Sequence, residues 1–245
     1  MESLKTDAEQ ALGRSFWVAD PSLSAYVDVL ATTPFPTWAA NSLIVLAGTT
    51  VVTLTSSLMA GYGLSHCWFP GRRWIARVLL VTYVVPQTLL FLPLYLAVIT
   101  LDLENNLLSL ILTYPALAIP FCSWLLLNFF QSLPSQIEEA ATMEGGDRWR
   151  IFRDVLLPLA TPVMIAAAVF TVGTSASEFL YATIFLPNAA HQTLAAGMGL
   201  TQVDPDQLGG IVAGANLAAL PVILLCAGFS RYYVRGLTAA MLEGA

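Results

Sequence analysis

Lysine is almost absent from this chain. Its 245 residues include one lysine, Lys5, which stands in the sequence Leu-Lys-Thr. A Walker A phosphate-binding loop needs a lysine between a glycine and Ser or Thr. We therefore expect no ATP hydrolysis by this chain. No HExxH or GxSxG sequence is present, and we expect the two histidines, His66 and His191, to lie in loops, so we predict no catalytic residue.

Cysteine is also rare and shows no ligand spacing. Cys67, Cys122 and Cys226 are scattered, with no CxxC pair among them. Cysteine in this setting behaves as a small apolar residue. We therefore predict neither a metal site nor a structural disulfide.

Charge of either sign is scarce, and apolar residues take its place. Charged residues make up 11% of the chain and hydrophobic residues 57%, and the mean hydropathy is +0.71. A soluble domain carries roughly 25% charged residues. Most of the surface therefore faces a solvent other than water, and we predict an all-α membrane protein.

Five apolar stretches are each long enough to cross a bilayer, for which a helix needs about 20 residues. Glu178 is the one charged side chain well inside any of them, and several contain prolines, which membrane helices tolerate. We predict five transmembrane helices within a permease-like domain of residues 38–232, at about 38–62, 75–100, 107–130, 159–186 and 208–232.

Arginine placement predicts the orientation of these spans, because cytoplasmic loops accumulate Lys and Arg. Eight of the ten basic residues fall on one side, in the loops after the first and third spans and after the fifth: Arg72, Arg73, Arg77, Arg148, Arg150, Arg153, Arg231 and Arg235. The opposite loops between spans carry Asp102, Glu104, Asp204 and Asp206, and no Lys or Arg. We therefore expect residues 1–37 to be extracytoplasmic, and the loop 131–158 and the tail 233–245 to be cytoplasmic.

The cytosolic loop 131–158 predicts two short helices. Ser135 and Glu138 have the spacing of a capping box, and Gly145 suits a left-handed C-terminal cap. Asp147 is expected to cap a second helix that ends at Pro158. In the first helix one face is expected to carry Ile137, Ala140, Ala141 and Glu144, with small residues that allow a partner to approach closely.

The same loop resembles a known motif. Glu139-Ala140-Ala141, Gly145 and Leu157-Pro158 are similar to the EAA motif of ABC transporter permeases, in the version of the maltose-type carbohydrate importers. The resemblance extends to Trp38-Ala39-Ala40-Asn41-Ser42-Leu43 and to Ala60–Ser65 with Phe69–Arg72, which look like the family's W-x-x-N-S-L and A-Y-x-x-S-R-x-x-F-x-G-R stretches.

This resemblance implies the function and the partners. The EAA loop would be a coupling helix that docks on a separate ATPase, so the expected coupling residues are Glu138, Glu139, Ala140, Ala141, Gly145, Leu157 and Pro158. The expected partners are ABC ATPase subunits, a homologous second permease and an extracytoplasmic solute-binding protein, in a bacterial or archaeal cell membrane. ATP and Mg would bind the ATPase, and this chain would carry no cofactor.

Two departures from the family pattern stand out. Members of the family usually have six spans, and the first of these has no counterpart among the five predicted here. The chain is therefore expected to be either a start-site truncation or a five-span variant. The family's W-N-E-F in the fifth span is here Ala176-Ser177-Glu178-Phe179. Glu178 either lines the translocation path or is a structural acid, and the structural reading is favoured.

A predicted outer loop before the last span contains Gly197-Met198-Gly199, where the backbone can approach a partner closely. This loop either contacts the binding protein or is a plain connector. The main alternative for the whole chain is an ion-coupled secondary transporter or channel subunit, although such proteins usually place several ionisable groups at mid-membrane. A non-transporting membrane protein would not need the EAA loop.

Overall fold

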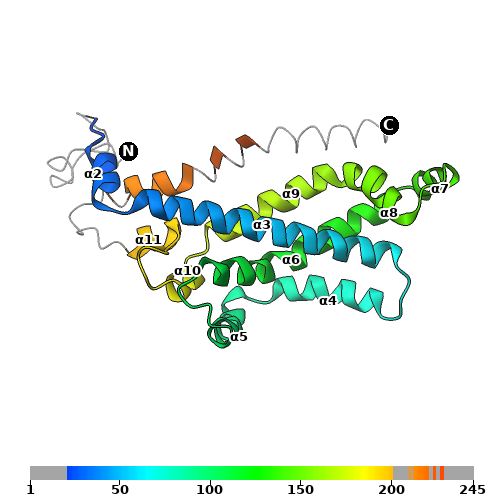
Figure 1. The fold of residues 1–245 in the computed structure, drawn as a ribbon, viewed down its shortest axis with the longest axis horizontal. Helices are drawn as coiled ribbons and strands as arrows, with labels where there is room; N and C mark the ends of the chain where they lie inside the picture. The colour runs from blue at the N-terminus through cyan, green and yellow to red at the C-terminus, as the bar shows by residue number, and fades with distance from the viewer. Residues whose placement is uncertain (1–20, 201–209, 211, 221–222, 225–226, 229–245) are drawn as a thin grey trace. The chain divides into compact units, whose positions relative to one another are not determined.

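The computed structural model describes residues 21–200, 210, 212–220, 223–224 and 227–228. Within this part of the chain all regular structure is helical and no strand occurs, as the sequence predicts (Figure 1). The helices are α2 (Ser24–Thr32), α3 (Phe35–His66), α4 (Arg72–Val84), α5 (Gln87–Thr100), α6 (Leu107–Ser132), α7 (Ser135–Met143), α8 (Arg148–Ile151), the π-helical turn η2 (Phe152–Leu156), α9 (Leu157–Ala176), α10 (Leu180–Phe185) and α11 (Leu194–Leu200).

Three helices in the described residues are long and apolar enough to cross a membrane: Phe35–His66, Leu107–Ser132 and the combined helix Arg148–Ala176. They contain the predicted spans at 38–62 and 107–130 and the first part of the span at 159–186. Helix α6 continues through Pro115 and Pro120, as membrane helices can when neighbouring groups satisfy the freed carbonyls. With α4 and α5 taken together as a fourth candidate, the described residues support three or four spans.

The predicted span at 75–100 is divided between two helices. The chain forms two helices with a bend at Val85-Pro86 between them. Val85 is extended, with φ −64° and ψ 127°. A proline disfavours helical geometry in the residue before it, which explains the break at this position.

The predicted span at 159–186 also contains a helix break near its C-terminal end. Helix α9 ends at Ala176, and α10 begins at Leu180. Glu178 lies in the break, where its carboxylate accepts hydrogen bonds from the N–H groups of Leu180 at 3.0 Å and Tyr181 at 2.9 Å. An acidic side chain that satisfies the free N–H groups of a new helix favours a helix start there.

Several predicted segments lie partly or wholly outside the described residues. The tail 233–245 and residues 1–20 fall outside them, and of the fifth span only 210, 212–220, 223–224 and 227–228 are described, all of them helical. The segment 1–37 is predicted to precede the first span, yet α2 occupies Ser24–Thr32 and α3 already begins at Phe35.

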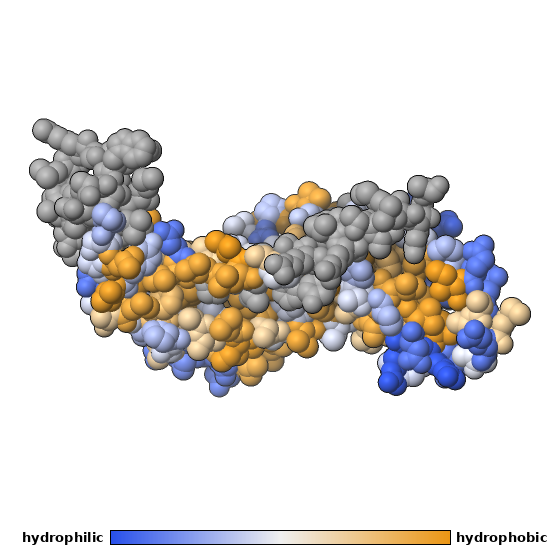
Figure 2. Space-filling model, turned by 90° about the horizontal axis from the view of Figure 1, so that it is seen from above, coloured by the Kyte–Doolittle hydropathy of each residue, from blue (hydrophilic) through white to orange (hydrophobic). Residues whose placement is uncertain are grey.

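Apolar side chains cover much of the visible surface (Figure 2). Val51 is 62% exposed, Leu89 67% and Val84 73%. A water-soluble surface rarely exposes contiguous apolar patches of this kind, whereas a surface facing lipid does. This surface supports the assignment of the long helices to a bilayer.

The described residues divide between two compact units. One contains residues within 1–48, 91–111 and 175–225, and the other residues within 49–90, 112–174 and 226–245. Helices α3 and α6 each contribute to both. In the second unit a core cluster consists of Leu126, Phe130, Ile151, Leu156 and Ala160. In the first, Ala25, Val29 and Ala213 form a smaller cluster.

A ridge of small residues runs along the part of α3 in the second unit. Thr49, Thr53, Ser57 and Gly61 follow one another at four-residue spacing, and all four are buried. A Cβ atom on Gly61 would lie 2.9 Å from Cβ of Leu126 and 3.0 Å from the backbone nitrogen of Leu127 in α6. Small residues at this spacing let two membrane helices approach closely.

This contact yields a test with a matched control on the same helix. Gly61→Ala should destabilise the protein by about 1–3 kcal/mol because the new methyl group overlaps α6. Gly63→Ala should leave stability unchanged or raise it by up to about 1 kcal/mol, since a Cβ there meets nothing within 4 Å. Thermal unfolding in detergent would compare the variants, and equal unfolding temperatures would rule out the close α3–α6 contact.

Candidate functional site

The loop between α6 and α9 begins with α7, whose N-terminal end differs from the prediction. The residue before the helix is Pro134, with φ −63° and ψ 135°, and no side chain caps α7. Ser135 is already the first helical residue, so the predicted Ser135–Glu138 capping box is wrong. Proline fixes φ near this value and prefers the position before or at a helix start, which moves the start one residue toward Pro134.

The C-terminal end of α7 closes as the sequence predicts. Gly145 has φ +83°, its N–H donates to the Thr142 carbonyl at 3.0 Å, and the Gly146 N–H donates to the Ala141 carbonyl at 3.1 Å. This pair of bonds is the Schellman motif. A Cβ on Gly146 would lie 2.9 Å from the Ala141 oxygen. The two glycines are therefore required for different reasons, conformation at Gly145 and space at Gly146.

The second helix of the loop has the predicted start and a different end. The Asp147 carboxylate accepts the Arg150 N–H at 2.9 Å, which caps α8. The chain then passes through η2, where the Leu157 N–H donates to the Phe152 carbonyl, and continues into α9. The predicted end at Pro158 is wrong. In the π turn the hydrogen bonds before Pro158 already reach back five residues instead of four. The missing N–H of Pro158 therefore does not end the helix.

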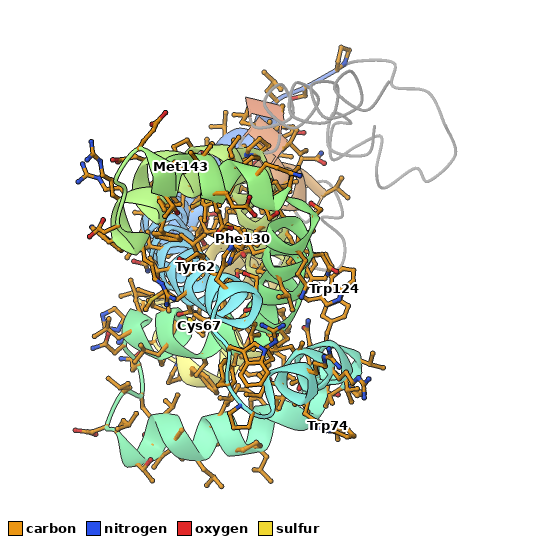
Figure 3. The ribbon with its side chains drawn as sticks, turned by 90° about the vertical axis from the view of Figure 1, so that its right-hand side faces the viewer. Tyr62, Cys67, Trp74, Trp124, Phe130 and Met143 are labelled. Atoms are coloured by element: carbon orange, nitrogen blue, oxygen red, sulfur yellow. The ribbon has the colours of Figure 1, made fainter. Side chains whose placement is uncertain are left out.

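Helix α7 has an inner and an outer face. Ala141 is half-buried and packs against the core cluster of Leu126 and Phe130, and Ile137 is also half-buried. Glu139, Ala140 and Met143 are exposed, and Met143 is 89% exposed. Figure 3 shows Met143 at the outside of α7, away from the packed pair Tyr62 and Phe130. The expectation that Ala140 and Ala141 share one partner-facing surface is therefore corrected.

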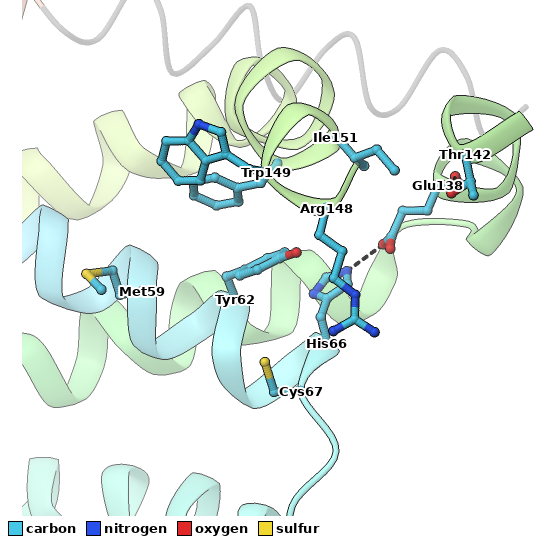
Figure 4. A pocket seen from close by; sticks show the side chains of 10 residues that line it. Met59, Tyr62, His66, Cys67, Glu138, Thr142, Arg148, Trp149 and Ile151 are labelled. Atoms are coloured by element: carbon cyan, nitrogen blue, oxygen red, sulfur yellow. Dashed lines mark hydrogen bonds and ion pairs between the residues drawn. The ribbon is translucent and has the colours of Figure 1, made fainter. Parts of the chain in front are cut away.

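A groove of about 530 Å³ lies where α7 and α8 meet the end of α3. Its lining includes Tyr62, His66, Glu138, Arg148, Trp149 and Phe152 (Figure 4). His66 Nε2 lies 2.5 Å from Oε1 of Glu138. The prediction that His66 lies in a loop is wrong, because it is the last residue of α3.

The remaining predicted coupling residues lie at the start of α9. Leu157 is half-buried and Pro158 exposed, directly after η2. Leu156 beside them is fully buried in the same cluster that receives Ala141. Ala141 from the first half of the motif and Leu156, the neighbour of its second half, therefore meet in one packed cluster.

The other predicted site residues belong to the first compact unit and make local contacts there. The Glu178 carboxylate is bonded to the start of α10, as a structural acid would be. Gly197 and Gly199 lie in α11 rather than in an irregular loop. Gly197 is buried, and a Cβ on it would overlap the Trp38 ring, while one on Gly199 would overlap the Phe179 ring. Met198 packs against the cluster of Ala25, Val29 and Ala213.

The structure also shows hydrogen bonds between the start of α3 and residues 189–194 that the sequence did not reveal. Trp38 Nε1 donates to the Ala189 carbonyl at 2.7 Å, and Asn41 Nδ2 donates to the carbonyls of Ala190 and Gln192, both at 3.0 Å. The Leu194 N–H donates to Ser42 Oγ at 2.7 Å. The W-x-x-N-S stretch thus fixes residues 189–194. Its resemblance to the family was the available signal, but partners about 150 residues away could not be inferred from it.

Comparison with known proteins decides the family. Residues 11–239 match the family described as the binding-protein-dependent transport system inner membrane component. The chain belongs to this family. The match confirms the resemblance to ABC importer permeases drawn from the EAA loop.

Individual relatives agree with the family assignment. The permease is 30% identical over 227 residues to the trehalose/maltose transport system permease protein MalG of Thermococcus litoralis, which covers 91% of this chain and 82% of that protein. It is 31% identical over 244 residues to the sulfoquinovosyl glycerol transport system permease protein SmoH of Agrobacterium fabrum, covering 99% and 86%.

One solved structure shares the fold. A bacterial ABC transporter involved in alginate import superposes with a TM-score of 0.79 at 23% identity, covering 95% of this chain and 87% of that one. The permease is therefore an inner-membrane subunit of an ATP-driven importer whose ATPase is a separate subunit. The alternative of an ion-coupled transporter or channel subunit is not favoured.

The loop geometry predicts the effect of changing Gly145. Gly145→Ala should destabilise the closed loop by about 1–2 kcal/mol, because φ +83° is unfavourable for a residue with a Cβ. Gly145→Asn should lose less, since asparagine tolerates this conformation. Hydrogen exchange of the amides in 139–146 of the purified permease would measure the difference, and the account fails if alanine and asparagine exchange alike at the wild-type rate.

Proposed function

We propose that the outer face of α7, formed by Glu139, Ala140 and Met143, docks on the ATPase subunit of the importer. The observation that carries this proposal is the exposure of that face on a helix whose other face is packed and whose C-terminal end is closed. An exposed methionine beside an alanine gives an apolar contact with little steric bulk, which suits insertion into a partner cleft.

The proposed topology follows the arginine distribution. Arg148, Arg150 and Arg153 are all exposed around α8, as expected for a loop in the cytosol. The proposal comprises five spans, an outer N-terminal segment and a cytoplasmic C-terminal tail. On this topology the Trp38–Asn41 contacts with residues 189–192 lie on the outer side.

Carbohydrate is the proposed substrate class. Support comes from the relatives, whose names specify trehalose and maltose, sulfoquinovosyl glycerol and diacetylchitobiose. The proposed complex contains this permease, a homologous second permease, ATPase subunits that bind ATP and Mg, and an extracytoplasmic binding protein. Closure of the ATPases would move the docked α7, and the spans would alternate between inward-open and outward-open states.

For Glu178 and for Gly197 we propose more limited roles than solute binding or direct contact with a partner. We propose that Glu178 holds the break between α9 and α10 rather than binding solute, in keeping with its bonds to Leu180 and Tyr181. A contact of Gly197–Met198–Gly199 with the binding protein stays a prediction. Buried Gly197 would contribute to it by allowing α11 to pack on Trp38.

The docking proposal predicts a selective defect. Ala140→Arg should reduce co-purification of the ATPase and ATP-dependent uptake about 10-fold or more, because a bulky charge at the centre of an apolar contact costs at least about 2 kcal/mol. The permease itself should insert and fold normally, since Ala140 is exposed.

Ala31→Arg is the matched control. Ala31 is equally an exposed helical alanine, in α2, and lies on the side proposed to face away from the ATPase. Uptake of labelled maltose and trehalose can be followed in right-side-out vesicles, with inverted vesicles as the control. Normal ATPase binding by Ala140→Arg, or equal loss with Ala31→Arg, would rule out the proposed docking face.

A further inference from the structure

His66 is held in a fixed position at the C-terminal end of α3. Its ring stacks on Tyr62 with centroids 4.6 Å apart and an interplanar angle of 22°. The Phe130 ring contacts it edge-on at 5.9 Å. Only 18% of the His66 side chain is exposed. A ring confined on two sides has a fixed orientation.

The hydrogen bonds around His66 form a directed chain. Ser65 Oγ donates to the Tyr62 carbonyl at 2.9 Å, and His66 Nδ1 lies 2.6 Å from the same Oγ. The Ser65 hydroxyl therefore lies against one ring nitrogen and helps to fix the orientation of the ring. Nε2 faces the Glu138 carboxylate at 2.5 Å, which can only accept. A carboxylate that accepts a ring N–H makes a charge-assisted hydrogen bond, which is stronger than a neutral one.

Helix α7 has few other attachments to the membrane helices. It contains no fully buried residue, and its apolar contacts come from the half-buried Ile137 and Ala141. Among the described residues, the Glu138–His66 bond is the one side-chain hydrogen bond that joins α7 to another helix. Figure 4 shows this bond as a dashed line between His66 at the end of α3 and Glu138 in α7.

We propose that His66 is a positioning residue for coupling: through Glu138 it ties α7 to α3, so that movement of a docked α7 reaches α3 as well as α9. Glu138 then differs in role from its neighbour Glu139, since its carboxylate turns inward to α3 while Glu139 is exposed. This inference rests on the docking role of α7 proposed above.

Four variants separate the hydrogen bond from ring packing. His66→Phe keeps an aromatic ring beside Tyr62 but cannot donate to Glu138. His66→Gln loses the ring yet places an amide N–H near the position of Nε2. Glu138→Ala removes the acceptor, and the double variant His66→Phe/Glu138→Ala completes a cycle. Cys67→Ala is the control, because Cys67 lines the same groove and makes no contact with Glu138.

The first measurement is hydrogen exchange on the purified permease. His66→Phe and Glu138→Ala should each speed exchange of the α7 amides roughly 5- to 20-fold, as loss of a charge-assisted bond allows. The double variant should match the single ones, and His66→Gln and Cys67→Ala should stay near wild type. Unchanged exchange in His66→Phe, additive effects in the double variant, or failure of His66→Gln to retain protection would overturn the proposed link.

The second measurement is MgATP hydrolysis by the assembled transporter in nanodiscs, with and without its binding protein. His66→Phe should bind as much ATPase as wild type but lose severalfold in stimulation by the binding protein, with His66→Gln retaining it. Full stimulation in His66→Phe would overturn the coupling role. If the wild-type permease binds no ATPase, the docking proposal fails instead, and the exchange measurement still decides the His66–Glu138 link.

Discussion

The rest of the loop depends on one constraint, the unbroken helix from Arg148 to Ala176. Asp147 caps its N-terminal end, η2 is a wider π-helical turn within it, and α9 forms its apolar part. Because the backbone hydrogen bonds continue from α8 through η2 into α9, the loop has no flexible joint on this side. A displacement of the loop is therefore a displacement of the span. This rigidity would let the docked loop proposed above move a membrane helix.

Helix α7 divides its residues between two tasks, and the division explains the composition of the motif. Ala141 must be small because it lies against the Leu126–Phe130 cluster, whereas Ala140 is exposed and belongs to the face proposed to dock on the ATPase. Gly145 reverses the chain so that Gly146 fits under the Ala141 carbonyl. Glu138 is directed to His66. This short helix thus holds the loop to its own protein on one side and leaves Glu139, Ala140 and Met143 exposed on the other.

The sequence was most informative where the interactions are local. Apolar length located the long helices, and the caps at Gly145 and Asp147 follow from residues a few positions apart. Proline effects were less predictable, because the breaking of α4–α5 at Pro86 and the continuation through Pro158 depend on the surrounding hydrogen bonds. The bonds from His66 to Glu138 and from Asn41 to Gln192 join residues 72 and 151 positions apart. No spacing rule reaches that far, so these contacts required the structure.

The most direct test of the central claim is the rate at which a maleimide labels a cysteine introduced as Met143→Cys, in a Cys67→Ser background, with and without the ATPase subunit. Met143 is 89% exposed, so labelling of the permease alone should be fast. The account predicts strong protection when the ATPase binds, while an Ala31→Cys reference in the same background keeps its rate. Equal labelling at position 143 in the assembled complex would contradict the claim that this face of α7 is the docking surface.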